Sequence, residues 1–567
     1  MVQVVAAPQH QSTIQNKFLE ASNLFPDIGV STSQSQNQST GPEIPDANIG
    51  GSSSRDQESQ EDQGKQGKII SRTKKRLNNN NTDPIVTMSL IDDLQRLGIA
   101  YHFDEEIQAL SSQCFNFQSG KDDLFGTSLC FRLLRQQCHN ASIDMFLKFK
   151  DKNGRFKEEL SKDLRGLQSL YEASYMGIEG EELLSQAMEF SKHHLQASMD
   201  WLQPSLAKQV GMSLAFPTPR MMEKFEARRY IENWKQDLRK NSEIIELATL
   251  DFNSVQSLYQ REITELKRWW RELGLAHKLP FARDQPLECF LWTVGIFPEP
   301  NYSECRIEVA KAVAILLVLD DIYDSYGSLD ELILFTEAVQ RWDIAGIDHL
   351  PEYMKICYMA LYNNINETSY KILKEHGWCI IPQLTKQWQK ICEAFLVEAR
   401  WFCNNHVPKL DDYLNNGITT TGTYMALVYA FYLIGKQVTK ESADLVNACP
   451  KLFYNSGRIL RLWDDLGTAK DEQERGDVAS SIEICKKENG FLSEEDARDG
   501  VRGLIDQTWK DLNKELIGLS PLGQSLIKAS LNLARTSQLI YQHGDDEKAP
   551  GIEDSIHSLL IEPIHYS

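Results

Sequence analysis

The segment at residues 309–324, VAKAVAILLVLDDIYD, constrains the fold of this chain more than any other stretch. Its aliphatic run has the length and composition of a buried helix, and it ends in three carboxylates, Asp320, Asp321 and Asp324. Carboxylates at the end of a core helix need a counter-charge. On an α-helix Asp320 and Asp324 project from the same face, so two carboxylates converge on one point. We therefore expect a hard divalent cation at this end of the helix.

A second acidic segment lies later in the chain, at residues 458–477, RILRLWDDLGTAKDEQERGD. Asp464, Thr468 and Glu472 recur every four residues and form one helical stripe of oxygen ligands. Magnesium prefers oxygen ligands and is usually held by one or two carboxylates together with waters and substrate phosphates. An acidic pair alone is more often a solvated helix face. Two such stripes, each attached to an apolar helix, instead predict a site that binds a diphosphate through bridging magnesium ions.

These two segments resemble the metal motifs of a known family. DDIYD at residues 320–324 resembles the aspartate-rich motif of class I terpene synthases, and DDLGTAKDE at residues 464–472 resembles their second metal motif, (N/D)DxxSxxxE. Further segments resemble plant members of the family: FARDQPLEC at 281–289, YGSLDELILFTEAVQRWD at 326–343, FLVEARWF at 395–402 and LIDDLQRLGIAYHF at 90–103. The resemblance extends over residues 68–567. It implies a prenyl diphosphate substrate and three Mg²⁺ ions, with Mn²⁺ as a substitute.

Composition and periodicity divide the chain into three parts. Residues 1–66 are rich in Ser, Gln, Asn and Gly without apolar periodicity, which predicts a disordered extension. Residues 67–250 and 251–567 carry apolar residues every three or four positions, which predicts helices throughout. We therefore expect an all-α fold of two helical domains. The resemblance implies that the first is non-catalytic and that the second is a helical bundle with the active site in its core.

The beginning of the chain resembles a plastid transit peptide in part. The first 19 residues contain no acid, one lysine and several Ser and Gln. The acids that then follow are more than such peptides usually contain, and they include Glu20, Asp27, Glu43, Asp46, Asp56 and Glu58. We expect a plastid protein, with a cytoplasmic one as the alternative.

Charge and hydropathy exclude several other classes of function. The formal net charge of -20 argues against a nucleic-acid surface, because phosphate backbones are bound by lysine and arginine. The longest apolar runs, such as residues 424–435, are shorter than the ~20 residues that cross a bilayer, so we expect no membrane span. The 11 cysteines form no CxxC pair, which predicts reduced thiols in an intracellular protein. We expect a monomer.

The resemblance also implies roles for four residues outside the metal motifs. Arg283 and Arg461 correspond to arginines that bind the diphosphate, although a lone arginine on a helix is more often a surface residue. The position two residues after Arg283 is Gln285, where the family's RxR element has its second arginine. Trp292 and Tyr541 are candidates for the aromatic wall that stabilises a carbocation, because ring faces attract positive charge without attacking it. Either ring could instead belong to the core.

Two segments resemble parts that shape the family's pocket. Residues 419–422, TTTG, resemble a helix break that lines it, and residues 543–548, HGDDEK, resemble a loop that closes over the metals. Glycine and threonine also occur at ordinary helix kinks, and the acids of the second segment could face solvent. The DxDD acid of class II cyclases is absent, so chemistry initiated by protonation is not supported.

The product is predicted from two departures from cyclising relatives. The chain lacks the R-R-x8-W signature of many cyclic monoterpene synthases and has Gln285 in place of an arginine. A neutral amide holds diphosphate less firmly than the forked guanidinium group of arginine. The diphosphate would therefore recombine less often with the tertiary carbon of the cation, and capture of the cation by water would be faster than ring closure. We expect linalool from geranyl diphosphate or nerolidol from farnesyl diphosphate. The alternatives are a cyclising synthase, a chain-elongating prenyltransferase, whose second aspartate-rich motif is missing here, and a non-catalytic scaffold.

Overall fold

A computed structural model describes residues 52–79, 82–114, 123–234, 242–435, 438–448, 450–475, 479–490, 493–517, 522–542 and 552–565. Within these ranges the regular elements are helices, apart from one isolated bridge between Lys150 and Phe156. The all-α prediction is therefore confirmed. Residues 1–51 of the predicted extension and the segment 543–548 lie outside the described residues.

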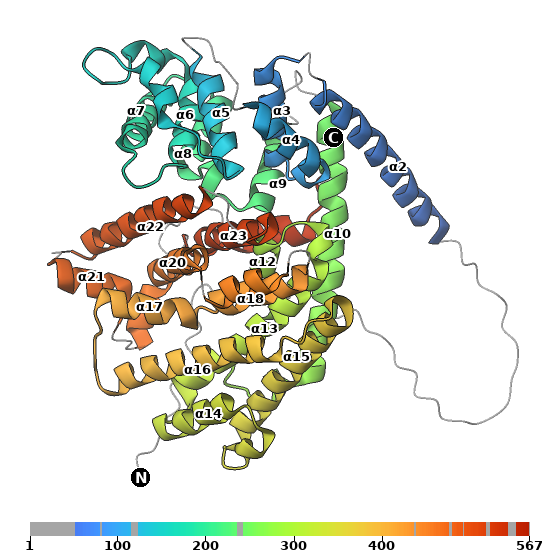
Figure 1. Cartoon of the computed structure of the whole chain (residues 1–567), viewed down its shortest axis with the longest axis vertical. Helices are drawn as coiled ribbons and strands as arrows, with labels where there is room; N and C mark the ends of the chain where they lie inside the picture. Colours follow the sequence, from blue (N-terminus) through green and yellow to red (C-terminus); the bar gives the residue numbers. More distant parts are fainter. Residues whose placement is uncertain are drawn as a thin grey trace, which may run out of the picture.

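The helices that follow α2 form a group at the top of Figure 1. They are α3 (Pro84–Arg96), α4 (Asp104–Cys114), α5 (Leu124–Gln136), α6 (Leu164–Ser174), α7 (Glu182–Ser198), α8 (Pro204–Ala215) and α9 (Glu223–Trp234). Three of them begin at an aspartate whose side chain accepts a hydrogen bond from a free backbone N–H: Asp83 at α3, Asp123 at α5 and Asp163 at α6. These caps fix where the helices start.

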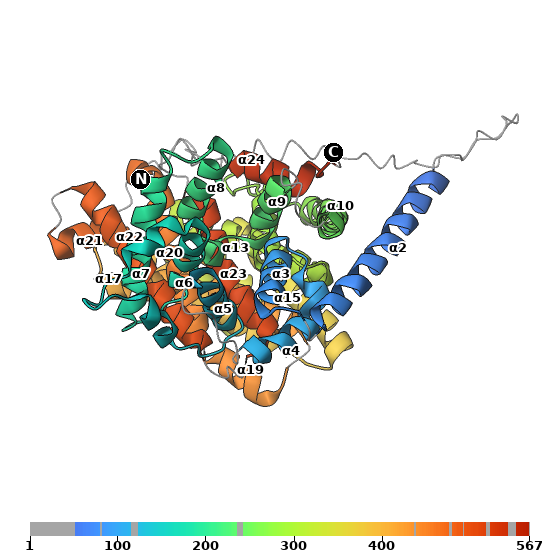
Figure 2. The ribbon, with the colours of Figure 1, turned by 90° about the horizontal axis from the view of Figure 1, so that it is seen from above.

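Helix α2 (Ser52–Leu77) differs from the disorder expected through residue 66, because residues 52–66 form its first part. Its polar composition gives no local signal for order, but its later part packs on the body. Ile69 and Leu77 are buried, and Lys65 and Arg72 pair with acids of α10 (Ser242–Leu273). Figures 1 and 2 show the beginning of α2 projecting from the molecule. Residues 52–66 of the predicted extension are therefore helical, and Lys65 near their end pairs with Glu246 of α10.

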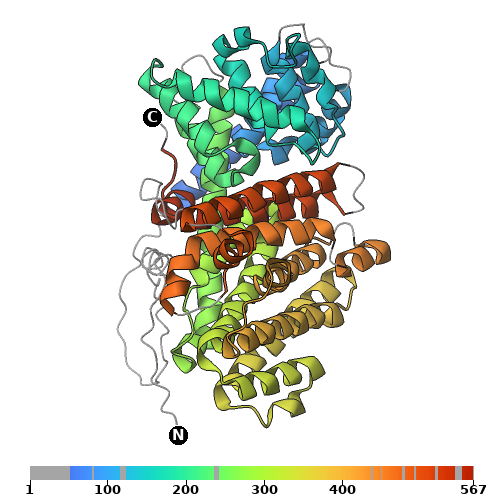
Figure 3. The same ribbon diagram turned by 90° about the vertical axis from the view of Figure 1, so that its left-hand side faces the viewer.

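The remaining helices form a bundle below the first group, as Figure 3 shows. They are α11 (Leu275–Lys278), α12 (Pro286–Ile296), α13 (Ser303–Asp321), α14 (Leu329–Arg341), α15 (Glu352–His376), α16 (Ile381–Cys403), α17 (Leu410–Thr420), α18 (Thr423–Ile434), α19 (Lys440–Asn447), α20 (Lys451–Arg475), α21 (Ser481–Asn489), α22 (Glu494–Leu516), α23 (Gln524–Tyr541) and α24 (Ile552–Ile556). Helix α13 is buried on nearly all sides and packs on α10, α12, α15 and α18, so it lies in the core.

Helix α10 crosses the boundary that the sequence predicts at residues 250 and 251. It is continuous from Ser242 to Leu273, and one cluster of buried apolar side chains includes residues of both halves. Arg306 of α13 is fully buried and binds both carboxylate oxygens of Glu262 on α10, at 2.7 Å each. This bidentate pair fastens the core helix to the helix that joins the two halves.

A break between α17 and α18 interrupts an apolar stretch of the bundle. Gly422 has a φ of +73°, which favours glycine, and α17 and α18 diverge by 41° there. A Cβ at Gly422 would lie 2.4 Å from Leu316 of α13, so the break also needs glycine for its close approach to the core helix. No single helix in the described ranges has the length and hydropathy of a membrane span, although α17 and α18 taken together do.

The cysteines whose side chains are described are all free: Cys130, Cys138, Cys289, Cys305, Cys357, Cys379, Cys392, Cys403 and Cys485. Burial raises the pKa of several of these thiols, for example that of Cys392 to about 12. A thiol with a raised pKa carries little reactive thiolate at neutral pH. The buried members, Cys130, Cys289, Cys305, Cys357, Cys392 and Cys485, therefore contribute as small apolar side chains of the core.

Candidate active site

The first acidic motif lies where the core helix α13 leaves the interior. Helix α13 ends at Asp321 and continues as the π-helical turn η6 (Ile322–Tyr326), which the Gly327 N–H closes by donating to the Ile322 carbonyl at 2.8 Å. The side chains of Asp320 and Asp321 are 31% and 17% exposed, and Asp324 is exposed. The turn that separates Asp320 from Asp324 is therefore wider than the α-helical turn expected from the sequence. Such π-helical turns are frequent at functional sites.

Arg283 is bound directly to this motif. Its backbone N–H donates to Asp321 Oδ2 at 2.7 Å, its Nε lies 2.9 Å from Asp321 Oδ1, and its Nη2 pairs with Asp320. Burial lowers the pKa of Arg283, but Asp321 and Asp320 outweigh this effect and raise it. Burial also raises the pKa of Asp321 to about 6, against the opposing effect of Arg283. The predicted diphosphate-binding arginine therefore pairs with two of the three carboxylates, and its single positive charge offsets one of their negative charges.

The loop that carries Arg283 is held on both sides. Phe281 stacks on Tyr326 with ring centroids 3.8 Å apart and planes 7° apart, and Tyr353 meets both rings edge-on. Asp284 accepts a hydrogen bond from the Trp270 indole N–H at 2.6 Å. Aromatic pairs of this kind add stability beyond their buried area. Arg283 is thus fixed relative to η6 by neighbours on both sides of it in the sequence.

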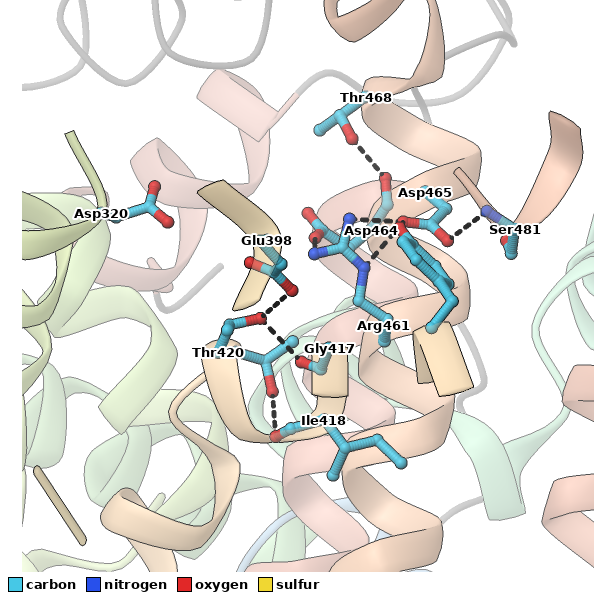
Figure 4. A network of polar contacts seen from close by, with 12 residues as sticks. Asp320, Glu398, Gly417, Ile418, Thr420, Arg461, Asp464, Asp465, Thr468 and Ser481 are labelled. Atoms are coloured by element: carbon cyan, nitrogen blue, oxygen red, sulfur yellow. Dashed lines mark hydrogen bonds and ion pairs between the residues drawn. The ribbon is translucent and has the colours of Figure 1, made fainter. Parts of the chain in front are cut away.

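The second acidic motif lies on α20. Asp464 Oδ2 lies 3.2 Å from Nη1 of Arg461, and Figure 4 shows both side chains directed at one another. The Thr468 hydroxyl donates to the backbone carbonyl of Asp464 at 2.8 Å. In this structure the hydroxyl is therefore hydrogen-bonded to the backbone of its own helix. Glu472 belongs to α20, but its side chain lies outside the described residues. The structure thus pairs Asp464 with Arg461, and the roles of Asp464, Thr468 and Glu472 as metal ligands stay predictions.

Trp292 and Tyr541 lie together beside this motif. Their ring centroids are 6.0 Å apart, with an angle of 51° between the planes. The Tyr541 hydroxyl hydrogen-bonds to the carboxylate of Asp464. A Cβ at Gly467 would lie 2.9 Å from the backbone oxygen of Tyr541, so this glycine lets α23 approach α20 closely. Tyr541 therefore contacts a predicted metal ligand, Trp292 lies beside Tyr541, and both rings are partly buried.

Two further carboxylates near these motifs did not stand out in the sequence. Glu398 of α16 accepts hydrogen bonds from Asn416 at 3.0 Å and from Thr420 at 3.1 Å. Figure 4 shows it between Asp320 on one side and the Arg461 pair on the other. Glu288 lies on α12, one helical turn before Trp292. Burial raises its pKa to about 7, with Arg283 opposing and Asp464 and Asp321 adding to the increase.

The helix break contributes to the same region. Thr420, the last residue of α17, donates to Glu398, and the Thr421 hydroxyl donates to the Ile418 carbonyl at 2.9 Å. Figure 4 shows these contacts on the Glu398 side of Arg461. The threonine and glycine run at residues 419–422 is therefore a real break next to the site. Its predicted role in lining the pocket stays a prediction.

The donor set fits a hard divalent cation that is shared with a ligand. No three His, Cys, Asp or Glu side chains in the described part of the chain are close enough to hold a metal without help. The donors of both motifs are nevertheless oxygen atoms, and the two arginines offset only part of their negative charge. Magnesium commonly takes one or two protein carboxylates and completes its shell with waters and substrate phosphates. The residues present match that mode of binding.

The free energy of unfolding of the metal-free protein is expected to rise by about 1 kcal/mol between pH 7.5 and pH 6.0 through Glu398. Burial raises the pKa of this carboxyl from 4.5 to about 7, so over that range the folded protein binds a proton that the unfolded chain does not. The stabilisation is complete near pH 4.5 and is lost above pH 7. Urea unfolding in EDTA at both pH values measures it. Glu398→Gln is expected to remove this part of the difference, and an unchanged difference would refute the assignment to Glu398.

Comparison with known proteins identifies the family. Residues 45–214 match the amino-terminal domain of terpene synthases, and residues 271–511 match the metal-binding domain of the terpene synthase family. A protein from Cananga odorata named monoterpene synthase TPS4, chloroplastic, is 51% identical over 506 residues, which cover 89% of this chain and 86% of that protein. This chain belongs to the terpene synthase family. It is accordingly an enzyme of the carbon–oxygen lyase class, and its fold is the class I terpene synthase fold.

Other members of the family are similar over the same length. R-linalool synthase, chloroplastic, from Ocimum basilicum is 45% identical and covers 88% of this chain and 86% of its own. Isoprene synthase from Populus x canescens, in complex with three Mg²⁺ ions and dimethylallyl-S-thiolodiphosphate, has a TM-score of 0.84 at 40% identity, covering 89% of this chain and 97% of its own. A limonene synthase with 2-fluorolinalyl diphosphate has a TM-score of 0.85 at 37% identity, covering 89% and 95%.

Proposed function

We propose that this terpene synthase ionises geranyl diphosphate with the help of magnesium, releases diphosphate and yields linalool by capture of the carbocation by water. The observation that carries the ionisation step is the arrangement of two acidic motifs, each joined to an arginine: Asp320 and Asp321 to Arg283, and Asp464 to Arg461. Such a site suits a diphosphate. The carboxylates would bind metal cations, and the cations and the two guanidinium groups would together neutralise the charge of the diphosphate.

The residues that would hold the ions are those of the two motifs. They are Asp320, Asp321, Asp324, Asp464, Thr468 and Glu472. Bound magnesium supplies electrophilic assistance, since it neutralises the charge that develops on the departing diphosphate. Three ions are proposed because the isoprene synthase structure contains three, and Mn²⁺ is proposed as a substitute. The arginines Arg283 and Arg461 would bind the phosphate oxygens and keep the leaving group oriented.

The carbocation would be stabilised by Trp292 and Tyr541. Tyr541 contacts Asp464 and Trp292 lies beside Tyr541, so a substrate whose diphosphate meets this motif would have its hydrocarbon chain near the two rings. A ring face stabilises a cation by about 2 kcal/mol or more when water is excluded. The Tyr541 hydroxyl is the ring substituent most able to attack the carbocation as a nucleophile, and its hydrogen bond to Asp464 would keep it from doing so. Both residues would thus stabilise the cation without forming a product with it.

The acyclic alcohol is supported by Gln285. This residue directly precedes α12, and its side chain is 3% exposed, so it brings a neutral amide where the family's RxR element has a second guanidinium. A diphosphate held by Arg283 alone on that side would return less often to the tertiary carbon, and water would capture the cation first. The similarity to R-linalool synthase supports the same product.

Geranyl diphosphate and a plastid location are proposed together. The Cananga odorata and Ocimum basilicum proteins are both named chloroplastic, and the first is named a monoterpene synthase. Farnesyl diphosphate, with nerolidol as product, remains the alternative for a cytoplasmic protein. We also propose that the enzyme acts as a monomer, which light scattering after size exclusion tests.

A cyclising monoterpene synthase is the second candidate. The similarity to limonene synthase over 89% of this chain supports it, because that protein's name denotes a cyclic product. The two candidates share the metal site and the ionisation step. They differ only in the fate of the cation.

Gas chromatography with mass detection tests the proposal. The purified protein is given Mg²⁺ or Mn²⁺ with geranyl or farnesyl diphosphate in separate reactions, and EDTA serves as the metal-free control. Linalool is expected as the dominant product from geranyl diphosphate, with no product in EDTA. Mostly cyclic hydrocarbons would favour the second candidate and refute the role given to Gln285. Failure to release diphosphate from either substrate would refute the function as a whole.

A further inference from the structure

Asp465 directly follows Asp464, yet the structure gives it a different environment. Its side chain is fully buried, whereas that of Asp464 is 18% exposed. Oδ1 accepts hydrogen bonds from Nε of Arg461 at 2.7 Å, from Nη2 of Arg461 and from the Tyr413 hydroxyl at 2.8 Å. Oδ2 accepts from the backbone N–H of Ser481 at 2.9 Å. A buried carboxylate is tolerated only when it is paired and hydrogen-bonded in this way.

These partners come from three helices. Tyr413 lies on α17, Arg461 and Asp465 lie on α20, and Ser481 is the first residue of α21. The carboxylate therefore meets the positive end of α21, where it also satisfies a free backbone N–H. Figure 4 shows Asp465 between Ser481 and Arg461, on the side of Arg461 away from Glu398. One side chain thus fastens three helices at the point where Arg461 leaves α20.

Residues of α17 also restrict the conformation of the Arg461 side chain. A Cβ at Gly417 would lie 2.8 Å from Cδ of Arg461, so the arginine side chain passes close to α17 and would have to shift if this glycine were replaced. The Tyr413 ring lies 5.6 Å from the guanidinium carbon, within reach of a cation–π contact. With Gly417 and Tyr413 on one side and Asp465 at its Nε, the guanidinium has little freedom to turn. Its Nη1 then lies 3.2 Å from Asp464.

The two carboxylates compete unequally for Arg461. Asp464 meets the guanidinium at one nitrogen, whereas Asp465 meets it at two and is held by Tyr413 and Ser481 as well. When a diphosphate and its cations occupy the site, Asp464 can therefore exchange its contact with Arg461 for another partner. The bond to Asp465 would then remain and would keep the arginine in the same orientation. An arginine that is already oriented loses less side-chain entropy on binding a phosphate.

We infer that Asp465 is a positioning residue, which orients Arg461 for binding the diphosphate by locking it to α17 and α21. The inference rests on the proposed function, because it takes Arg461 to be a diphosphate-binding residue. Asp465 acts only through Arg461 and makes no contact with the substrate itself. Its conservative replacement by asparagine keeps the shape of the side chain and removes its charge.

The test is a double-mutant cycle read out by binding of inorganic diphosphate. The dissociation constant is measured by calorimetry in saturating Mg²⁺ for the wild type, Asp465→Asn, Arg461→Gln and the double variant. Asp465→Asn is expected to weaken binding about tenfold, since a misplaced binding group loses most of its contribution. In the Arg461→Gln background the same change is expected to have no effect, because the residue through which Asp465 acts is gone. Equal effects in both backgrounds would overturn the inference.

Glu262→Gln is the matched control for structural damage. Glu262 is another buried carboxylate bound to an arginine, Arg306, and it lies outside the two acidic motifs. This variant is expected to lower the melting temperature without changing the dissociation constant for diphosphate. If Asp465→Asn lowers the melting temperature alone, its role is structural and the inference fails. If the wild type itself does not bind diphosphate in Mg²⁺, the proposed function fails instead.

Tyr413→Phe keeps the inference testable where Asp465→Asn does not fold. This change removes the hydroxyl that donates to Asp465 and leaves the ring and the pair with Arg461 in place. Binding of diphosphate is expected to weaken about threefold. The effect is small because the change removes one hydrogen bond to Asp465, and Asp465 itself acts on the diphosphate only through Arg461. The Arg461→Gln background is expected to abolish that effect. An unchanged dissociation constant in the wild-type background would overturn the inference.

Discussion

Asp321→Ala is expected to lower magnesium-dependent release of diphosphate from geranyl diphosphate by about a thousandfold or more. Asp321 is a predicted metal ligand, and it also accepts the backbone N–H of Arg283 at 2.7 Å and pairs with Nε of that residue. Its removal therefore takes a carboxylate from the first motif and leaves Arg283 paired with Asp320 alone among the acids of that motif. Released diphosphate, measured with excess Mg²⁺, reports the loss without depending on which terpene forms.

Asp330→Ala is the matched control for this result. Asp330 is an exposed carboxylate in the first turn of α14, a short distance along the chain from the first motif. The control is expected to release diphosphate at the rate of the wild type, with only a small loss of helix stability. If Asp321→Ala is folded by its melting curve and still releases diphosphate at a normal rate, the first motif is not the metal site.

Trp292→Leu is expected to reduce kcat/KM for geranyl diphosphate by about thirtyfold, which corresponds to about 2 kcal/mol of lost cation–π stabilisation. The indole lies 6.0 Å from the ring of Tyr541, whose hydroxyl hydrogen-bonds to Asp464, and the carbocation would form near these rings. Trp292→Phe keeps a ring in place and is expected to retain most of the rate. Steady-state kinetics together with the product profile measure both variants.

Trp201→Leu provides the control for this prediction. Trp201 lies in the amino-terminal half and is 68% exposed, so the same substitution there removes an indole that is remote from the motifs in the sequence and open to solvent. Its kinetics are expected to match those of the wild type. If Trp292→Leu also matches the wild type while its melting temperature falls, Trp292 is a core residue and not part of the site.

The sequence alone determined the fold class and the elements that carry the acidic motifs. Apolar residues every three or four positions predict helices from local geometry, and these helices are present. The two motifs stood out because four-residue spacing places oxygen ligands on one face of a single helix. Arg283 and Arg461 were assigned by resemblance, and both lie against the acids that the sequence singled out. Predictions of this kind depend on residues close together in the chain.

Tertiary structure decided the features that join distant segments. Helix α2 is ordered in part by acids of α10, which its own polar composition cannot reveal. Glu398 is one carboxylate on an amphipathic helix, and only folding brings it between Asp320 and Arg461. Asp464 and Asp465 are adjacent, yet one faces the site and the other faces α17 and α21. Which side of a helix is buried depends on the helices packed against it, and that information is not contained in the spacing of residues along one segment.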